Sequence, residues 1–304
     1  MGACGMSKLT FGDRVMMIII YVFLILLTFV TFYPFWNSIV ISFNDGKDTM
    51  LGGITFWPRK FTLDNYQIVF QDKRLINAFM IAVLRTVVGT IMSVLATAIL
   101  AYGLSKRELI GRKYIMIFCL ITMFFSGGLI PTFLLIRSLG LLDTFWVMII
   151  PTLIQVWNMI IFRTFFQQLP VGLEESAKID GAGYWGIFFK IVIPLSGPVI
   201  ATLSLFTAVF HWNDWFFPSI YITSENLIPI QTLLQKILNV NTATSQTGQM
   251  DAGAIAHLSE ALSSVTGKSL SMATMMVATV PIILVYPFVQ KHFVKGVLIG
   301  SLKE

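Results

Sequence analysis

The segment at residues 169–198 reads LPVGLEESAKIDGAGYWGIFFKIVIPLSGP and separates two long apolar runs of the chain. It is polar, acidic and interrupted by glycines. Pro170 suits the first turn of a helix, and Glu174 and Glu175 near the N-terminus of that helix would complement its dipole. Gly181 is expected to end the helix. The segment therefore predicts a short polar helix between two membrane spans.

A second, amphipathic helix is expected at residues 184–193, with Trp185 and Phe188 on its apolar side and Lys190 on its polar side. Pro194 and Pro198 would then turn the chain back into the membrane. An ordinary hairpin at the membrane surface would have the same polarity. Polarity alone therefore assigns no function to the segment.

The composition of the chain is that of a membrane protein. Hydrophobic residues make up 56% of the chain and charged residues 12%, whereas soluble domains contain about 25% charged residues. Six apolar runs are each long enough to cross roughly 30 Å of hydrocarbon as a helix. These runs lie at residues 15–41, 77–104, 114–136, 145–165, 198–222 and 272–293. We expect an all-α integral membrane protein with six transmembrane helices.

The distribution of basic residues predicts the orientation. With six spans, residues 1–14, the 169–198 loop and residues 294–304 lie on one side, together with the turn SKRELIGRK at residues 105–113. This turn has the densest cluster of Lys and Arg, and basic residues in short loops mark the cytoplasmic side. Both termini and the 169–198 loop are therefore expected in the cytoplasm, and residues 15–304 in one transmembrane domain.

Two long loops fall on the opposite, external side, at residues 43–76 and 223–271. The first contains Trp57, Phe61, Tyr66 and Phe70, which is aromatic enough to pack. The second is rich in Ser, Thr, Asn and Gln and then has a helical pattern, AIAHLSEALSSV. Loops longer than about 12–15 residues are usually functional or disordered, and we favour a functional role.

The second apolar run has a stripe of small residues on one helix face, with a spacing of four, at Gly89, Ser93, Thr97 and Ala101. In lipid such residues let helix backbones approach closely, so the stripe predicts a packing face. Arg85 lies on the same face. We expect its side chain to extend to the outer membrane surface, and pairing with Asp214 is the alternative.

The fifth run contains His211, Trp212, Asn213, Asp214 and Trp215. A carboxylate at membrane depth is costly, so such residues usually face a bundle interior or a watery path. Aromatic rings beside polar groups also suit the binding of sugars. We predict that residues 212–215 line a substrate pathway or gate, and an aromatic belt at the membrane surface is the alternative.

Catalytic and metal sites are not predicted. The sequence Gly267-Lys268-Ser269 resembles the end of a phosphate-binding loop, but that motif needs a glycine where Leu262 stands. The three histidines are scattered, and no segment outside the apolar runs is long enough for a catalytic domain. The chain is therefore expected to be no enzyme and to bind no metal or cofactor itself.

The 169–198 segment resembles the EAA loop of importer-type ABC permeases, whose pattern is E-A-A-x3-G-x9-I-x-L-P. Here the pattern runs from Glu175 through Gly181 to Ile191 and Pro194, with Ser176 at the second position, where the family usually has alanine, and Ile193 in place of leucine. The resemblance implies a coupling helix that binds the ATPase subunits. The docking residues it implies are Glu174, Glu175, Ser176, Ala177, Asp180, Gly181, Ala182, Ile191 and Pro194.

Other segments resemble landmarks of the second permease of maltose-type carbohydrate importers. These are AYGLSK at 101–106, GLLDT at 140–144 and WND at 212–214, and the C-terminal tail is similar to the branch that serves complex oligosaccharides derived from pectin or alginate. The resemblance implies a type I ABC importer permease in the bacterial cell membrane. It also implies a second permease, two ATPases that hold ATP and Mg²⁺, a sugar-binding protein outside the membrane and an oligosaccharide substrate.

Two other classes of protein are possible from the residues alone. An ion-coupled secondary carrier of small polar solutes would commonly show internal repeats, and none is visible here. A membrane enzyme of glycan assembly would need convergent acids or a metal site. The pore-forming subunit of an ATP-driven, binding-protein-dependent oligosaccharide importer is therefore the leading hypothesis.

Overall fold

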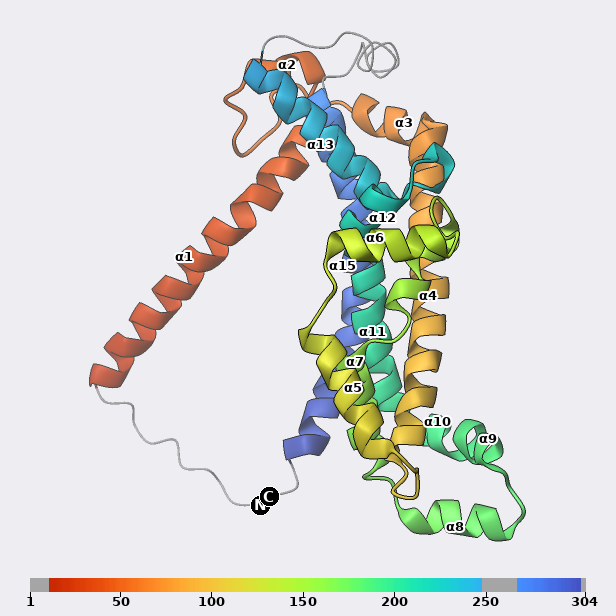
Figure 1. The fold of residues 1–304 in the computed structure, drawn as a ribbon. Coiled ribbons are helices and arrows are strands. Elements are labelled where there is room, and N and C mark those ends of the chain that lie inside the picture. Colours follow the sequence, from red (N-terminus) through yellow and green to blue (C-terminus); the bar gives the residue numbers. More distant parts are fainter. Residues whose placement is uncertain (1–10, 248–266, 302–304) are drawn as a thin grey trace. The chain divides into compact units, whose positions relative to one another are not determined.

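The computed structural model describes residues 11–247 and 267–301, which form helices joined by turns (Figure 1). Within these ranges no strand occurs, apart from one isolated bridge between Asn44 and Phe61. The chain divides into two compact units, Met1–Val69 with Asn241–Met276 and Phe70–Val240 with Val277–Glu304. In chain order, and across both units, the first six helices are α1 (Phe11–Ser42), α2 (Gly46–Met50), α3 (Asp64–Gln71), α4 (Lys73–Ser105), α5 (Arg112–Phe124) and α6 (Leu129–Ser138).

Short 3-10 helices η1 (Phe145–Met148) and η2 (Ile150–Thr152) follow, and the remaining elements surround the 169–198 segment or come after it. These are α7 (Val156–Phe166), α8 (Val171–Ile179), α9 (Tyr184–Ile187), the π-helix η3 (Phe188–Val192), α10 (Ile193–Leu195), α11 (Gly197–Asn213), α12 (Phe216–Tyr221), η4 (Glu225–Leu227), α13 (Ile230–Thr247) and α15 (Gly267–Ser301). The helix expected at AIAHLSEALSSV lies outside the described residues. The backbone of residues 294–301, expected as a tail, continues α15.

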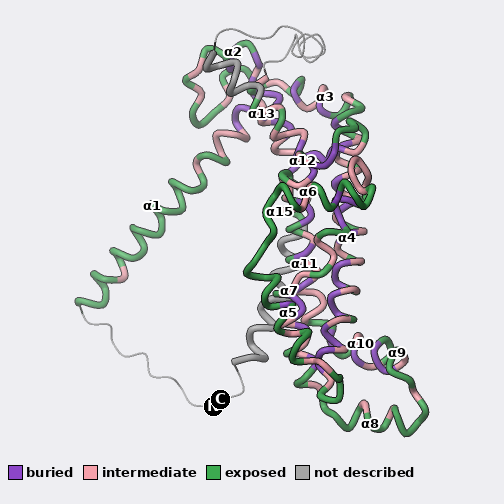
Figure 2. The backbone as a smooth tube through the Cα atoms, in the orientation of Figure 1, coloured by how far each residue is buried: buried purple, intermediate pink, exposed green. Residues whose placement is uncertain are grey.

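In the first unit, α1 is exposed along most of its length (Figure 2). The loop that follows is packed, as its aromatic residues predicted. Phe43 stacks on Phe61 with ring centroids 5.6 Å apart. Asn65 donates hydrogen bonds of 2.9 Å to the carbonyls of Ser42 and Asn44, and so holds α3 to the end of α1.

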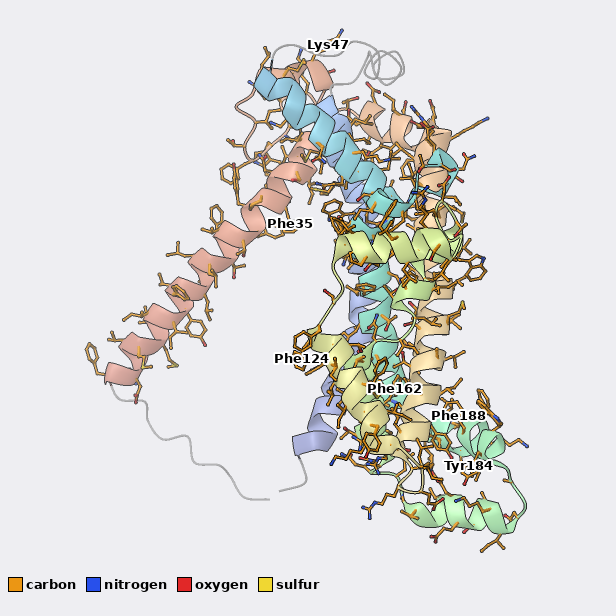
Figure 3. All side chains as sticks on the ribbon, viewed as in Figure 1. Phe35, Lys47, Phe124, Phe162, Tyr184 and Phe188 are labelled. Atoms are coloured by element: carbon orange, nitrogen blue, oxygen red, sulfur yellow. The ribbon has the colours of Figure 1, made fainter. Side chains whose placement is uncertain are left out.

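The second unit is built around α4, which packs along both α7 and α11 (Figure 1). Its core joins these three helices to α9 and η3. Phe162 of α7 and Phe188 of η3 are almost completely buried in it (Figure 3). The stripe of small residues on α4 is buried, as predicted. Ser93 Oγ donates a 2.8 Å hydrogen bond to the carbonyl of Leu153, so the stripe is polar as well as small.

Three of the six predicted spans are continuous helices, α1, α4 and α15. The other three are interrupted, which corrects the expectation of one unbroken helix for each run. The run at 114–136 bends by 117° between α5 and α6, where Gly128 has a φ of +83°. The run at 145–165 bends by 51° before α7, after two 3-10 helices that include Pro151.

The fifth run, expected to be helical over residues 198–222, ends its first helix at Asn213. Asp214 leaves the helical conformation (φ −73°, ψ 102°), and α12 begins two residues later. At the N-terminal end of α11, α10 and α11 meet at an 84° bend at Ser196, close to Pro194 and Pro198. Within residues 11–247 and 267–301 there are thus three continuous helices of membrane-spanning length, or up to six spans if each bent pair counts as one.

We predict that Gly89→Ala destabilises the fold. A Cβ at this position would lie 2.8 Å from Nε2 of His211, closer than packed atoms come. Such overpacking costs about 1–3 kcal/mol. Gly103→Ala is the matched control, because Gly103 lies on the same helix and a Cβ there meets nothing within 4 Å. Thermal unfolding of the detergent-solubilised protein should show a lower midpoint for Gly89→Ala only. Equal midpoints for both variants would contradict close packing of α4 against α11.

Candidate functional site

Helix α8 is the exposed helix predicted from the 169–198 segment, and it lies at one end of the bundle, beyond the end of α4 (Figure 1). Pro170 has φ −59° and ψ 121° and precedes α8 as its N-cap. The sequence predicts Pro170 in the first turn of the helix, and this is wrong by one residue. Its extended ψ angle places Pro170 just before the first turn. Glu174 lies in the first turn, where its charge complements the helix dipole.

The end of α8 at Gly181 is confirmed. Gly181 has a φ of +81°, which costs glycine little and other residues more. The amide of Ala182 donates to the carbonyl of Ala177 at 2.9 Å, and the amide of Gly181 donates to that of Lys178 at 3.0 Å. These two bonds form a Schellman motif, the common end of an α-helix. The chain is thereby turned sharply at a fixed point.

The amphipathic helix expected at 184–193 is present as α9, η3 and α10, with a π-helical turn in the middle. Ile187 and Phe188 are buried in the core of the second unit. Tyr184 and Trp185 are more than half exposed, and Figure 3 shows Tyr184 at the start of this stretch. One side of the segment therefore attaches to the bundle while the other faces outward.

An ion pair joins α8 to the end of α4. Nζ of Lys106 binds the carboxylate of Glu174, and both side chains are largely buried. Lys106 also lies 4.3 Å from the centre of the Tyr102 ring, where a cation is attracted by the aromatic face. Nearby, Nε of Arg163 donates a 3.0 Å hydrogen bond to the carbonyl of Leu104, so α7 is tied to the same end of α4.

The nine docking residues implied by the EAA resemblance divide into two groups. Glu174, Ala177, Ala182 and Ile191 are partly buried. Of these, Ala177, Ala182 and Ile191 pack against the core, so their small or apolar side chains attach the loop to the bundle. The exposed members are Glu175, Ser176, Asp180, Gly181 and Pro194.

Three exposed apolar side chains on α8 were not predicted as site residues. Val171 is 68% exposed, Leu173 45% and Ile179 86%. Val171 and Leu173 precede the EAA pattern and Ile179 occupies a position that it leaves open, so the pattern gave no reason to select them. Exposed aliphatic side chains on an otherwise polar helix are a signal that sequence inspection could have used.

The second candidate region is the break between α11 and α12, at Asp214 and Trp215. Trp212, in the last turn of α11, is buried, and its Nε1 donates to the carbonyl of Ala278 at 3.2 Å. Asn213 is exposed, and Trp215 is 40% exposed. Oδ1 of Asp214 accepts a 3.1 Å hydrogen bond from the amide of Phe217, in the first turn of α12. Trp212 and Asp214 therefore face the protein, and Asn213 and Trp215 face outward.

Arg85 pairs with Asp214, which corrects the expectation that its side chain extends to the membrane surface. Its guanidinium is only 1% exposed and binds the Asp214 carboxylate through Nη2. Nη1 donates a 2.7 Å hydrogen bond to the backbone carbonyl of the same residue. The alternative of pairing was correct because the helix break exposes a carbonyl that only a donor from another helix can satisfy.

His211 lies one turn before this break and is also buried, at 1% exposure. Its ring contacts Gly89 of the small-residue stripe. Neither ring nitrogen has a hydrogen-bond partner among the described residues. Within those residues no three His, Cys, Asp or Glu side chains are grouped as a metal site would require.

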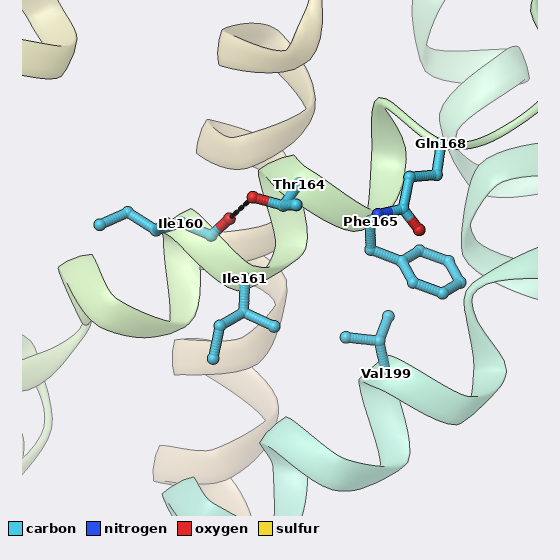
Figure 4. A pocket seen from close by; sticks show the side chains of 6 residues that line it. All are labelled: Ile160, Ile161, Thr164, Phe165, Gln168 and Val199. Carbon is cyan, nitrogen blue, oxygen red and sulfur yellow. Dashed lines mark hydrogen bonds between the residues drawn. The ribbon is translucent and has the colours of Figure 1, made fainter. Parts of the chain in front are cut away.

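A pocket of about 300 Å³ lies between α7 and the start of α11 (Figure 4). Its lining is mostly apolar, from Ile160, Ile161, Phe165 and Val199, with Thr164 and Gln168. The Thr164 hydroxyl is already bound to the carbonyl of Ile160 at 2.8 Å. The pocket thus lacks the several free polar groups that a sugar site requires.

We predict that Arg85→Met and Asp214→Asn each destabilise the protein strongly. Removing one partner of a buried ion pair costs about 3–5 kcal/mol because the other charge is left buried. The double variant should lose less than the sum of the two single variants. The exposed pair Arg74 and Asp72, at 3.3 Å, is the control, since exposed pairs contribute about 0–1 kcal/mol. Unfolding midpoints in detergent measure the effects, and additive losses would contradict a direct interaction.

Comparison with known proteins identifies the family of the chain. A family model described as binding-protein-dependent transport system inner membrane component matches residues 89–299. This range includes α8, Asp214 and most of the bundle. The EAA resemblance is therefore confirmed as a family relationship.

The chain is 42% identical to the polygalacturonan/rhamnogalacturonan transport system permease protein YtcP of Bacillus subtilis, over 96% of this chain and 99% of that protein. It is 27% identical to the arabinooligosaccharides transport system permease protein AraQ of Halalkalibacterium halodurans, over 91% and 93%. A crystal structure of a bacterial ABC transporter involved in the import of the acidic polysaccharide alginate superposes with a TM-score of 0.84, at 29% identity, over 94% of this chain and 99% of that chain. The chain belongs to the binding-protein-dependent transport system inner membrane component family, the permease subunits of ABC importers.

Proposed function

We propose that the chain crosses the cytoplasmic membrane of a bacterium six times, with both termini in the cytoplasm. The basic turn at residues 105–113 and the α8 loop must then share the cytoplasmic side. The ion pair between Lys106 and Glu174 supports this topology, because it joins the turn and the loop at one end of α4. In this topology the bent pair of α5 and α6 counts as one span, as does the bent stretch from η1 to α7, and α11 with α12 forms the fifth span.

We further propose that α8 is the coupling helix and binds a cytoplasmic ATPase subunit. The observation that carries this proposal is the set of exposed apolar residues on a helix that is fixed at both ends. Ile179 is 86% exposed, although burial of such a side chain is favourable by about 1.5–3 kcal/mol. A short helix with apolar anchors is the form that a groove on a partner protein recognises.

The partners of the chain follow from this arrangement. A second permease would complete the pore, and two copies of the ATPase would bind the coupling helices. ATP and Mg²⁺ would be held by the ATPases, and this chain would hold no cofactor. A sugar-binding protein outside the membrane would contact the 223–271 loop, and the chain would contact lipid but no nucleic acid.

The cargo we propose is an oligosaccharide that contains uronic acids. Polygalacturonan appears in the name of the Bacillus subtilis permease described above, and alginate in the description of the superposed transporter. Both are polymers of uronic acids. Residues 212–215 at the α11/α12 break would line the pathway or form its gate. Asn213 and Trp215 are the members of this group whose side chains face outward and could reach a passing sugar.

Helix α4 would transmit the movement of the ATPases across the membrane. Its 33 residues form one unbroken helix, which is about 50 Å long at 1.5 Å per residue. Lys106 at one end binds the coupling helix, and Arg85 nearer the other end binds the α11/α12 break. Closure of the ATPases would therefore move both regions together.

The test is Ile179→Asp, which places a charge at the proposed contact with the ATPase. We expect this variant to lose the co-purifying ATPase or its stimulation, because the carboxylate would have to be desolvated in an apolar groove. Ile110→Asp is the matched control, since Ile110 is 94% exposed and lies in the basic turn on the same side. Co-expression with the partner subunits, followed by pull-down and ATPase assay in lipid, measures both variants.

Retention of full ATPase binding by Ile179→Asp would refute the docking role of α8. Equal loss in both variants would show that any charge on this surface disrupts the complex, which would also refute it. The family assignment decides against the ion-coupled secondary carrier, and no observation in the described residues favours a second function.

A further inference from the structure

Asp143 has a backbone conformation that requires an explanation. Its φ is 55°, and among the described residues it is the only non-glycine residue with a positive φ. Aspartate tolerates this conformation better than most residues, but it remains uncommon. Asp143 belongs to the GLLDT segment between α6 and η1, for which the transport mechanism above gives no role.

Four hydrogen bonds join Asp143 to a segment about 80 residues later. Its amide donates to the carbonyl of Tyr221 at 2.9 Å. Oδ1 accepts hydrogen bonds of 2.8 Å from the amides of both Thr223 and Ser224. Oδ2 accepts a bond of 2.5 Å from the hydroxyl of Ser224. We call Asp143 and its three partners, Tyr221, Thr223 and Ser224, the Asp143 junction. The positive φ lets the amide and the carboxylate of Asp143 bind these partners at the same time.

The Asp143 junction lies at the start of the second long loop, which the proposed function places outside the membrane. η4 and α13 follow directly after Ser224. Nδ2 of Asn77, on α4, donates to the carbonyl of Asn226 at 2.8 Å. Further along, the Thr232 hydroxyl on α13 donates to the carbonyl of Trp215 at 3.0 Å. The base of α13 is therefore bonded both to α4 and to the α11/α12 break.

A small apolar core beneath the junction keeps these elements together. Tyr221 and Ile222 are buried with Val147 and Met148 of η1, and Ile228 completes the group. Apolar contacts in this core do not fix the orientation of the segments, because they are not directional. The hydrogen bonds of the Asp143 junction are directional and therefore fix it. The position of the segment that leads into α13 is thus set by Asp143.

We propose that Asp143 is a positioning residue for the external binding protein. It holds the base of α13 in the orientation in which the 223–271 loop receives that protein, and the Thr232 bond connects the same base to the α11/α12 break. This inference rests on the proposed function, since it takes the loop as the contact surface for the binding protein.

The Asp143 carboxylate is ionised under physiological conditions. The hydrogen bonds from the Ser224 hydroxyl and from the amides of Ser224 and Thr223 hold its pKa below the ordinary value of 3.8. All three bonds to the carboxylate are therefore in place at neutral pH, and they are lost only when the pH falls below that lowered value. Asn at this position would keep the Oδ1 contacts but lose the anionic acceptor for Ser224.

The experiment uses the complete importer in lipid, with ATPase activity measured against the concentration of the sugar-loaded binding protein. Asp143→Gly removes the side chain and tolerates the positive φ, so it breaks the junction without adding strain. We expect the half-saturating concentration of binding protein to rise about tenfold, which is less than the loss of the three bonds to the carboxylate could cause in full. The maximal rate should stay near that of the wild type. Asp143→Asn should give a smaller rise.

Asp64→Asn is the control for charge. Asp64 is exposed on the first external loop, outside the 223–271 contact surface, and no hydrogen bond or ion pair joins its side chain to any described residue. Its replacement removes a negative charge from the external side of the protein but leaves the junction intact. We expect no change in the half-saturating concentration. Co-purification of all subunits with Asp143→Gly shows that the variant folds and assembles.

The outcomes separate the two proposals. A wild-type complex that the binding protein does not stimulate would refute the proposed function itself. Stimulation of the wild type with an unchanged half-saturating concentration in Asp143→Gly would refute the role of Asp143 alone. An equal rise in Asp64→Asn would show that charge, not position, matters, and loss of assembly or of the maximal rate in Asp143→Gly would show that Asp143 is merely structural. Each of these two results would overturn the inference.

Discussion

A helix that is interrupted in lipid leaves backbone carbonyls and amides without partners, and lipid supplies none. In this protein two interruptions of the second unit, the α11/α12 break and the stretch between η2 and α7, are closed by side chains from neighbouring elements. Arg85 binds the carbonyl of Asp214, and Ser93 binds that of Leu153. Thr232 binds the carbonyl of Trp215 beside the same α11/α12 break. The arrangement of α4, α7, α11 and α13 depends on these few directional bonds, because apolar contacts with other helices differ little from contacts with lipid.

Helix α4 makes two of these three bonds and is itself unbroken. Its small-residue stripe lets α11 approach until the His211 ring touches Gly89. Only at that separation can the Arg85 side chain reach the α11/α12 break. At the other end the same helix binds Glu174 through Lys106. Close packing and polar bonding thus support one another along one helix.

The sequence predicted the 169–198 loop well because its signals are local. Gly181 ends the helix through the conformation of its own backbone, and this effect does not depend on the rest of the fold. The sequence also predicted the buried stripe on α4, since helical periodicity is local as well. Which side of α8 faces the bundle was not predictable, because that depends on Ala177 packing against helices elsewhere in the chain.

The interrupted spans and the pairing of Arg85 could not be predicted for a related reason. Hydropathy averages over about 19 residues and cannot detect a break of two to four residues. An arginine near the end of a span can extend to the surface or bind a partner, and both satisfy its charge. The choice depends on the carbonyl of Asp214, which is 129 residues away and becomes available only where α11 ends.

These bonds also limit how the α11/α12 break can move. Separating α4 from α11 by a few ångströms would leave a buried guanidinium, a carboxylate and a carbonyl without partners, at a cost of several kcal/mol. Water can replace the lost bonds, but only if it reaches the break. Opening at this point is therefore coupled to hydration of the space around it. The gate proposed at residues 212–215 would therefore stay closed while its ion pair is dry, and it would open only as part of a change that admits water on one side of the membrane.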